Sequence, residues 1–352
     1  MIISPTIEHT SEYTLHRSPG KHSLYNNQEI WWSDALSKWM CTNMQHIEQI
    51  LSDKNFRVHS YSVKALESRL DISLPHISEL TQYFPLAIEG TKHKEIRKEN
   101  ALNLANKFKD TLVSFESSLS LNVAPALFAK ENINLVKEII DPSLRAALIT
   151  LSGLENIEEG SIVSMSQMFD QLLNIKQRIK IDAQIARLLD SFESEIPLEE
   201  KYFRIAVFAI GYDSLLGSMT ESIGRTLLNN SNLKLSDIPW SEDIPCSGAP
   251  VIERVAIADC IIGEKTIRSG QKIRLYLESA GFNGSENSSH SGLFFGHGIH
   301  KCIAVHLSNA IWKVFVKEVT KIDQHFSLKH LKYRKNDYVF NVFDDITVDI
   351  YD

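Results

Sequence analysis

Apolar residues recur at spacings of three and four along most of the chain, which is the period of a helix with one buried face. Asp141 is expected to cap one of these stretches, Pro142 suits the turn that follows it, and Gly153 ends the stretch. The pattern predicts helices over residues 30–52, 95–115, 142–151, 164–191, 199–228 and 302–319.

Alternation of apolar and polar residues, the pattern of a half-buried strand, comes late in the chain. It covers residues 251–262 and 272–277, with a glycine turn at residues 263–265 between them. Residues 338–350 also alternate and are interrupted at residues 344–345, which predicts a terminal hairpin. The expected fold class is therefore mainly α with a small β portion.

Composition and charge narrow the class of protein. The chain has 352 residues, 43% of them hydrophobic, and no Pro/Gly/Ser-rich linker, so we expect a single domain over residues 1–352. Its net charge of −7, with both signs mixed throughout, argues against nucleic-acid binding. It lacks an apolar run of about 18 residues and a signal-peptide pattern, so no membrane contact is expected. Widely spaced cysteines indicate a reducing, cytoplasmic location.

One cysteine stands in a chemically informative position. Residues 294–304 read FFGHGIHKCIA and place Cys302 after a glycine-rich turn, directly before the apolar run 303–319. A thiolate there lies near the first N–H groups of a helix, which lower the pKa of a thiol. Two other interpretations stay open. Cys302 could be an inert buried thiol, or a metal ligand together with His297 and His300, although no partner pair at zinc-finger spacing lies nearby.

The same stretch resembles the haem-ligand loop of the cytochrome P-450 family. That loop reads Phe, Gly, any residue, Gly, any residue, His or Arg, any residue, Cys, any residue, Gly or Ala. The resemblance, to a short bacterial member, implies the P-450 fold, a bound haem b (iron protoporphyrin IX), and Cys302 as the axial thiolate that favours O–O cleavage. It also implies that Phe295 contacts the cofactor and that His300 donates to a propionate. The matching residues are Phe295, Gly296, Gly298, His300, Cys302 and Ala304.

Two further segments supply cationic residues that suit an anion. His93 and Arg97 are four residues apart at the start of a predicted helix, so they share one face. Bacterial P-450 proteins carry a similar His-x-x-x-Arg that binds a haem propionate. Arg254 stands where the family has a propionate-binding arginine in a strand. The alternative for His93 and Arg97 is a solvated basic face, because lysines flank them.

The helix predicted over residues 199–228 resembles the one that crosses the distal face of the haem. Its segment AIGYDSL implies that Gly211 allows close approach to haem and O₂. It also implies that Asp213 and Ser214 form the acid–alcohol pair that delivers protons, although the family usually has threonine in place of Ser214. The alternative is a core helix with a packing glycine and a buried aspartate.

The sequence departs from the family in three places. The Glu-x-x-Arg motif expected before Arg254 has Pro245 in the arginine place, so its ion pair and its hydrogen bonds to the cysteine loop cannot form. A polar stretch, residues 281–291, replaces the family's proline-rich meander. Residues 153–213 leave room for about two roof helices instead of three. We therefore expect an open pocket, suited to a large or carrier-tethered substrate or to closure by a partner.

These residues point first to a haem-thiolate monooxygenase that oxidises a small-molecule or carrier-bound substrate in a biosynthetic pathway. Its electrons would come from a ferredoxin or flavodoxin-type partner. The missing motif keeps two alternatives: a haem-thiolate peroxygenase, dehydratase or isomerase, and a degenerate P-450-like module that binds or recruits without catalysis. The lysines that could form a docking face for the redox partner, or be ordinary solvated residues, are Lys94, Lys98, Lys107, Lys109, Lys301, Lys313 and Lys317.

Overall fold

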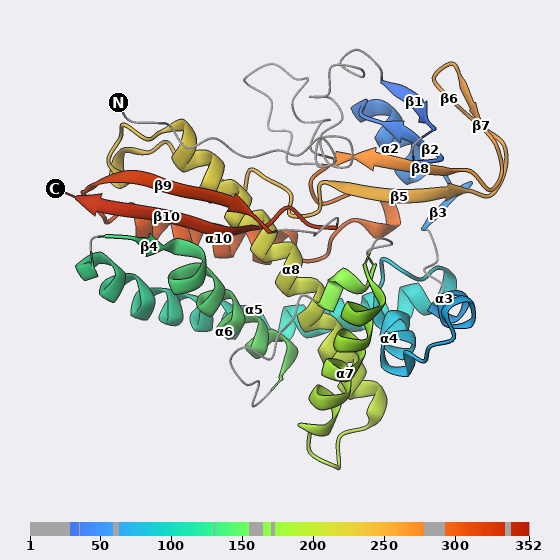
Figure 1. Ribbon diagram of the computed structural model, residues 1–352, viewed down its shortest axis with the longest axis horizontal. Helices are drawn as coiled ribbons and strands as arrows, with labels where there is room; N and C mark the ends of the chain where they lie inside the picture. The colour runs from blue at the N-terminus through green and yellow to red at the C-terminus, as the bar shows by residue number, and fades with distance from the viewer. Residues whose placement is uncertain are drawn as a thin grey trace.

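The computed structural model describes residues 29–34, 36–58, 63–129, 131–154, 165–169, 173–277, 293–334 and 339–351. Helices form most of this part, and smaller β sheets lie along one side of them (Figure 1). The prediction of a mainly α fold with a small β portion is confirmed. None of the described helices is both long enough and apolar enough to cross a membrane.

Four long helices build the body of the described chain. α5 (Gly90–Ala129) packs against α6 (Asp141–Ser152) and α10 (Val305–Val319), and α6 also packs against α8 (Leu198–Asn229). α8 is central, because residues on all of its sides are buried. The other helical elements are α2 (Met44–Ser52), α3 (Val63–Leu70), α4 (Pro75–Leu80), η2 (Thr81–Tyr83), η3 (Val136–Ile140), η4 (Met165–Phe169), α7 (Ile175–Asp190), η5 (Leu235–Asp237) and η7 (Gly298–His300).

The strands within the described residues form three sheets. The largest has the order β1-β2-β8-β5-β3, in which β2 and β8 are parallel and the other neighbours antiparallel. In the second, β10 is the central strand between β4 and β9, and β6 pairs with β7 in a hairpin. The strands are β1 (Ile30–Ser33), β2 (Lys38–Cys41), β3 (Phe56–Val58), β4 (Ile133–Asn134), β5 (Val251–Ala256), β6 (Cys260–Ile262), β7 (Lys265–Ile267), β8 (Lys272–Tyr276), β9 (His325–Tyr333) and β10 (Phe343–Tyr351).

The helix predicted over residues 30–52 is wrong in its first half, which folds as β1, a turn and β2. Trp31 and Met40 are cross-strand partners and pack with Tyr276 of β8 in a small buried cluster. A short apolar run fits the period of a helix and that of a strand equally well. Here the pairing of β2 with the distant strand β8 decides between them, and only α2 is helical.

Other predicted elements differ in extent. Residues 164–191 hold η4 and α7 rather than one helix. The hairpin predicted within residues 338–350 is wrong, because β10 is a single strand that pairs with β9. Asp141 does not cap α6: it is the first residue of that helix, and its carboxylate binds Arg145 at 2.8 Å instead. The predicted end of α6 at Gly153 is confirmed.

The chain that follows α8 returns across that helix at very short range. Residues 241–250 contain no helix, and a Cβ on Gly248 would lie 2.1 Å from the carbonyl oxygen of Ser214 and 2.7 Å from the amide nitrogen of Ser218. A Cβ on Gly217 would lie 2.7 Å from the carbonyl oxygen of Asn341. The backbones of α8 and of this returning segment therefore touch directly, which only glycine allows.

Candidate active site

Two left-handed glycines shape the cysteine loop. Gly296 and Gly298 have φ angles of 70° and 68°, a region that other residues rarely occupy. Gly298 also lies against the end of α2, where a Cβ would come within 2.6 Å of the Leu51 carbonyl oxygen. The amide of Cys302 donates to the carbonyl oxygen of Phe295 at 2.8 Å. This hydrogen bond closes the loop and fixes the position of the Cys302 backbone amide.

Cys302 is exposed, and α10 begins just after it at Val305 rather than at the cysteine itself. Its sulfur accepts a hydrogen bond from the Ala304 amide at 3.4 Å. Arg97 reaches the same loop and donates to the carbonyl oxygen of Lys301. Desolvation by the surrounding protein atoms raises the pKa of the thiol overall and outweighs the Ala304 amide and the Arg97 guanidinium, which lower it. The lowered thiol pKa predicted from the sequence is therefore wrong for this structure. Cys302 is exposed as a residue, which argues against an inert, fully buried cysteine, while protein atoms surround the sulfur itself.

Two histidines and an arginine from three elements meet at this loop. The rings of His93, on α5, and His300 have centroids 4.3 Å apart. Glu89 places its Oε1 atom 3.4 Å from His300 Nε2. Arg254, on β5, is 8% exposed and acts electrostatically on His300 and Glu89. The fold thus gathers residues that the sequence separates widely.

Burial makes this cluster electrostatically unusual. Desolvation, aided by Arg254 and His93, lowers the pKa of His300 to about 4, against the opposing effect of Glu89. Desolvation also lowers the pKa of His93, and lowers that of Arg254 to about 10. Nε2 of His93 and Nδ1 of His300 are buried without a hydrogen-bond partner within the described structure, and Nε2 of His300 has only the 3.4 Å contact with Glu89. An anion with several acceptor oxygens would accept from an N–H group of each ring and from the arginine together, so the residues fit the carboxylates of a haem.

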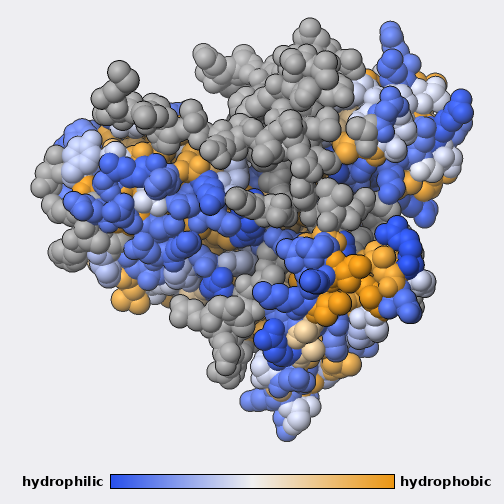
Figure 2. Space-filling view, viewed as in Figure 1, coloured by the Kyte–Doolittle hydropathy of each residue, from blue (hydrophilic) through white to orange (hydrophobic). Residues whose placement is uncertain are grey.

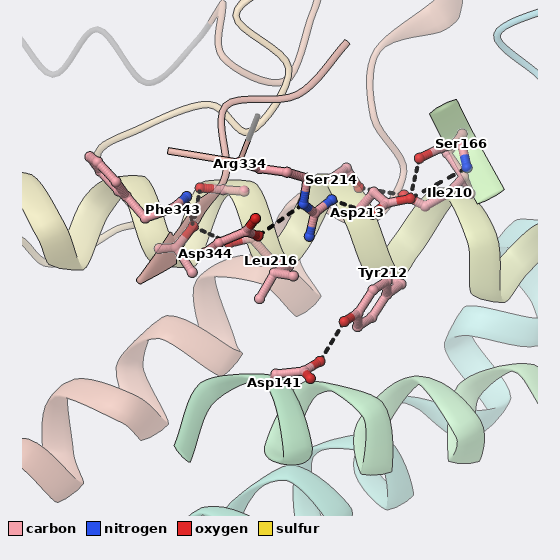
Figure 3. A network of polar contacts seen from close by, with 12 residues as sticks. Asp141, Ser166, Ile210, Tyr212, Asp213, Ser214, Leu216, Arg334, Phe343 and Asp344 are labelled. Carbon is pink, nitrogen blue, oxygen red and sulfur yellow. Dashed lines mark hydrogen bonds and ion pairs between the residues drawn. The ribbon is translucent and has the colours of Figure 1, made fainter. Parts of the chain in front are cut away.

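Asp213, on α8, is fully buried and held from two sides (Figure 3). Its Oδ1 atom lies 3.2 Å from Nη1 of Arg334, just after β9, and its Oδ2 atom accepts the hydroxyl of Ser166 on η4. Arg334 also binds Asp344 at 3.0 Å. Sequence reasoning missed Arg334 and Ser166, because only the fold brings them to the aspartate. The network ties α8 to η4 and to the C-terminal strands.

The neighbours of Asp213 on α8 are also engaged. The hydroxyl of Ser214 donates to the carbonyl oxygen of Ile210 at 2.6 Å, within the helix. A Cβ on Gly211 would lie 3.0 Å from Cδ2 of Leu148, so this glycine faces α6. The packing interpretation of Gly211 therefore fits its surroundings, and its close approach to haem and O₂ stays a prediction.

We expect Arg334→Leu to destabilise the protein by about 3–5 kcal/mol, because it leaves the Asp213 carboxylate buried without its arginine. Urea unfolding followed by circular dichroism measures the change. Asp344→Asn is the matched control, since Asp344 is 49% exposed and its ion pair with Arg334 is worth under about 1 kcal/mol. Equal losses in both variants would contradict the prediction. Adding Asp213→Asn to Arg334→Leu should restore part of the stability.

The metal and docking predictions have mixed outcomes. Among the described residues, no group of three or more His, Cys, Asp and Glu side chains could hold a metal ion, so a site built on His297 is not supported.

Two lysines of the predicted docking face are ion paired. Lys313 Nζ lies 3.4 Å from Asp243, and Lys317 Nζ lies 2.9 Å from Glu116. Four other lysines of the predicted docking face are exposed and have no ion pair within the described part of the chain: Lys94, Lys98, Lys109 and Lys301.

The chain matches solved structures over nearly its whole length. P450BioI, solved in complex with an acyl carrier protein ligated to hexadec-9Z-enoic acid, is 16% identical, with 97% of this chain and 100% of that chain covered and a TM-score of 0.75. CalO2 is 12% identical, with 99% of both chains covered and a TM-score of 0.77. CYP165D3, a monooxygenase involved in teicoplanin biosynthesis, is 15% identical, with 94% and 96% covered and a TM-score of 0.67. All are cytochrome P-450 structures. The chain has the cytochrome P-450 fold. No protein-family model and no curated protein matches its sequence.

Between α6 and α8, the described residues form η4 and α7, and residues 155–164 and 170–172 lie outside the described part of the chain. The reduced number of roof helices therefore stays a prediction. The polar stretch 281–291, predicted to replace the meander, lies outside the described residues.

Proposed function

We propose that this chain is a haem-thiolate monooxygenase that oxidises a small-molecule or carrier-bound substrate in a biosynthetic pathway. The observation that carries the proposal is the meeting of His93, His300 and Arg254, with partnerless buried ring nitrogens, next to the exposed Cys302. The likeness to cytochrome P-450 structures, several of them from biosynthetic pathways, supports an enzyme of this type.

Each residue of the cluster would have a distinct task. Cys302 would ligate the iron of haem b through its thiolate, which the Ala304 amide and Arg97 favour. The donors to the propionates would be His93, Arg97, Arg254 and His300, with Arg97 leaving its present acceptor, the Lys301 carbonyl oxygen. When bound, the haem supplies oxygen activation and transfer, and its thiolate ligand favours O–O cleavage. A ferredoxin or flavodoxin-type partner would deliver electrons after docking on the exposed lysines near the loop.

Asp213 and Ser214 remain the residues predicted to deliver protons. Their hydrogen bonds in this structure would have to change before they could do so. The Ser214 Oγ proton must leave the Ile210 carbonyl before it can pass to a substrate, while Asp213 is neutralised by Arg334. This engagement favours one second candidate: a haem-thiolate peroxygenase, dehydratase or isomerase, which needs no relay of protons to O₂.

The experiment that tests the proposal is a spectrum of the reduced, CO-treated protein, followed by turnover assays. A band at about 450 nm would establish thiolate-ligated haem. Turnover with NAD(P)H, a reductase system and O₂ is the result expected of a monooxygenase. Turnover with hydrogen peroxide alone, or without any oxidant, would select the second candidate. A protein that takes up no haem would overturn both and leave a binding or recruiting module.

A carrier-bound substrate is supported by the exposed face of α7, which lies between α6 and α8 in the chain. Ile175 and Ile179 lie one helical turn apart, and they are 39% and 48% exposed. Lys176, Lys180 and Arg187 form a basic stripe beside them. Figure 2 shows hydrophobic residues gathered on this side of the molecule, over the region where Figure 1 draws α4 and α7. An apolar stripe with a basic flank suits an acidic carrier protein, the kind of partner with which P450BioI was solved.

We expect the double variant Lys176→Glu/Lys180→Glu to weaken binding of a long-chain acyl carrier protein about tenfold, since it reverses two charges of the basic stripe. Isothermal titration calorimetry at two salt concentrations measures the change, and the wild type should lose more affinity with salt than the variant. Binding of the free fatty acid should not change. Lys54→Glu/Lys265→Glu reverses the same number of exposed charges on other elements. If this control pair weakens binding equally, α7 is not the docking face.

A further inference from the structure

We infer that residues 241–249 brace the cysteine loop in place of the missing Glu-x-x-Arg motif, and that Ser247 is the positioning residue that makes the contact. The inference rests on the proposed function, in which Cys302 ligates haem. In the P-450 family, the arginine of that motif hydrogen-bonds to the segment before the cysteine. Pro245 occupies the arginine place here, so the loop needs its support from elsewhere.

One end of this segment is fastened to α10, the helix that follows Cys302. The carbonyl oxygen of Ser241 accepts the indole N–H of Trp312 at 2.9 Å. The amide of Ile244 donates to Oδ1 of Asn309 at 3.3 Å. Trp312 is fully buried, so the first contact is held in a rigid part of the core. The segment therefore keeps a fixed position relative to the helix that carries the cysteine loop.

The other end is fastened to α8 and to the C-terminal part of the chain. The amide of Cys246 donates to Oγ of Ser222 at 3.2 Å, and the amide of Gly248 donates to Oγ of Ser218 at 2.8 Å. The carbonyl oxygen of Gly248 accepts the amide of Asn341 at 2.9 Å. With Ser218 and Ser222 one helical turn apart on α8, the segment lies along that helix with its amides satisfied by serine side chains.

Ser247 connects this fastened segment to the cysteine loop. Ser247 is 5% exposed. Its hydroxyl shares its single hydrogen between the carbonyl oxygen of Ala249 at 2.9 Å and that of Phe294 at 3.1 Å. Phe294 opens the loop, and the next carbonyl, that of Phe295, accepts the amide of Cys302 at 2.8 Å. Two adjacent peptide groups thus lead from Ser247 to the ligand residue.

This arrangement gives the serine a mechanical role rather than a chemical one. The hydroxyl holds the Phe294 peptide, and the Phe294–Phe295 peptides hold the Cys302 amide, so the direction of the thiol depends on the hydroxyl. A neutral hydrogen bond is weaker than the ion pair that it replaces. We therefore expect loss of the Ser247 hydroxyl to weaken the ligation of the haem iron by the Cys302 thiolate and to leave the stability of the fold nearly unchanged.

The test compares Ser247→Ala with Ser152→Ala, which removes another buried serine hydroxyl, one that donates to carbonyls within α6. In full-length haem-loaded protein, Ser247→Ala should lose the reduced-CO band at about 450 nm roughly fivefold faster than the wild type. Ser152→Ala should match the wild type. Thermal unfolding of the two variants should agree within about 3 °C. A wild-type decay rate in Ser247→Ala, or equal acceleration in both variants, would overturn the inference.

A second measurement separates this inference from the proposed function. Hydrogen exchange of haem-free protein reports on the Cys302 amide, which the Phe295 carbonyl protects. Its protection should fall about fivefold in Ser247→Ala and not in Ser152→Ala. If the wild type binds no haem, the proposed function fails while this readout still tests the brace. If haem binds and neither readout changes, only the brace fails.

Discussion

Replacing Cys302 with serine is expected to abolish the band at about 450 nm and all oxidative turnover, the largest effect that we predict. Serine keeps the size and the position at the end of the loop but has no thiolate, whose negative charge the Ala304 amide and Arg97 favour. The CO spectrum of the reduced protein and the haem content of the purified variant measure the loss.

Cys260→Ser is the matched control for this experiment. Cys260 is a buried free cysteine on β6, and its replacement should leave the band intact. An unchanged spectrum in Cys302→Ser would show that another residue ligates the iron. Loss of the band in both variants would show that the assay reports on folding rather than on ligation.

Replacing Gly248 with alanine is expected to cost more than about 3 kcal/mol of the free energy of unfolding. The new Cβ would lie 2.1 Å from the Ser214 carbonyl oxygen and 2.7 Å from the Ser218 amide nitrogen. Both are backbone atoms of α8, which cannot move aside as a side chain can. Relief would push the returning segment off the helix and break the hydrogen bond between Gly248 and Ser218. Chemical denaturation measures the loss.

Gly211→Ala is the control for this glycine replacement. It lies on the same helix, and its Cβ would meet only the Leu148 side chain, at 3.0 Å. Alanine also favours a helix over glycine by about 1 kcal/mol, so the change should be close to neutral. If Gly248→Ala proves as mild as Gly211→Ala, the close crossing of α8 is not as tight as the structure shows.

The sequence predicted the parts of the site that depend on short motifs. Cys302, His300, Arg254, His93 and Arg97 each stand in a pattern of fixed spacing, and the fold brings them to one place. The long helices followed equally well from their period, because a buried face repeats over many turns. These features are local in the chain, so the sequence carries them directly.

What the sequence did not reveal depends on distant pairing. Arg334 stands in no recognisable sequence motif, and its partner Asp213 lies on another element. Ser247 belongs to no motif, and its role follows only from its place beside Phe294. β1 and β2 were predicted as a helix because pairing with β8 lies outside any local window. Gly211 resembled a cofactor residue, yet its environment is set by α6.

The position of β10 has a consequence for the order in which the protein can fold during synthesis. Residues 343–351 form the central strand between β4 and β9, and Asn341 just before them binds the segment that crosses α8. A growing chain therefore presents unpaired strand edges and an incompletely covered α8 until these late residues emerge from the ribosome. Completion of the body therefore depends on residues that are made after the cysteine loop, although the cluster formed by His93, Arg254 and His300 is already present by then.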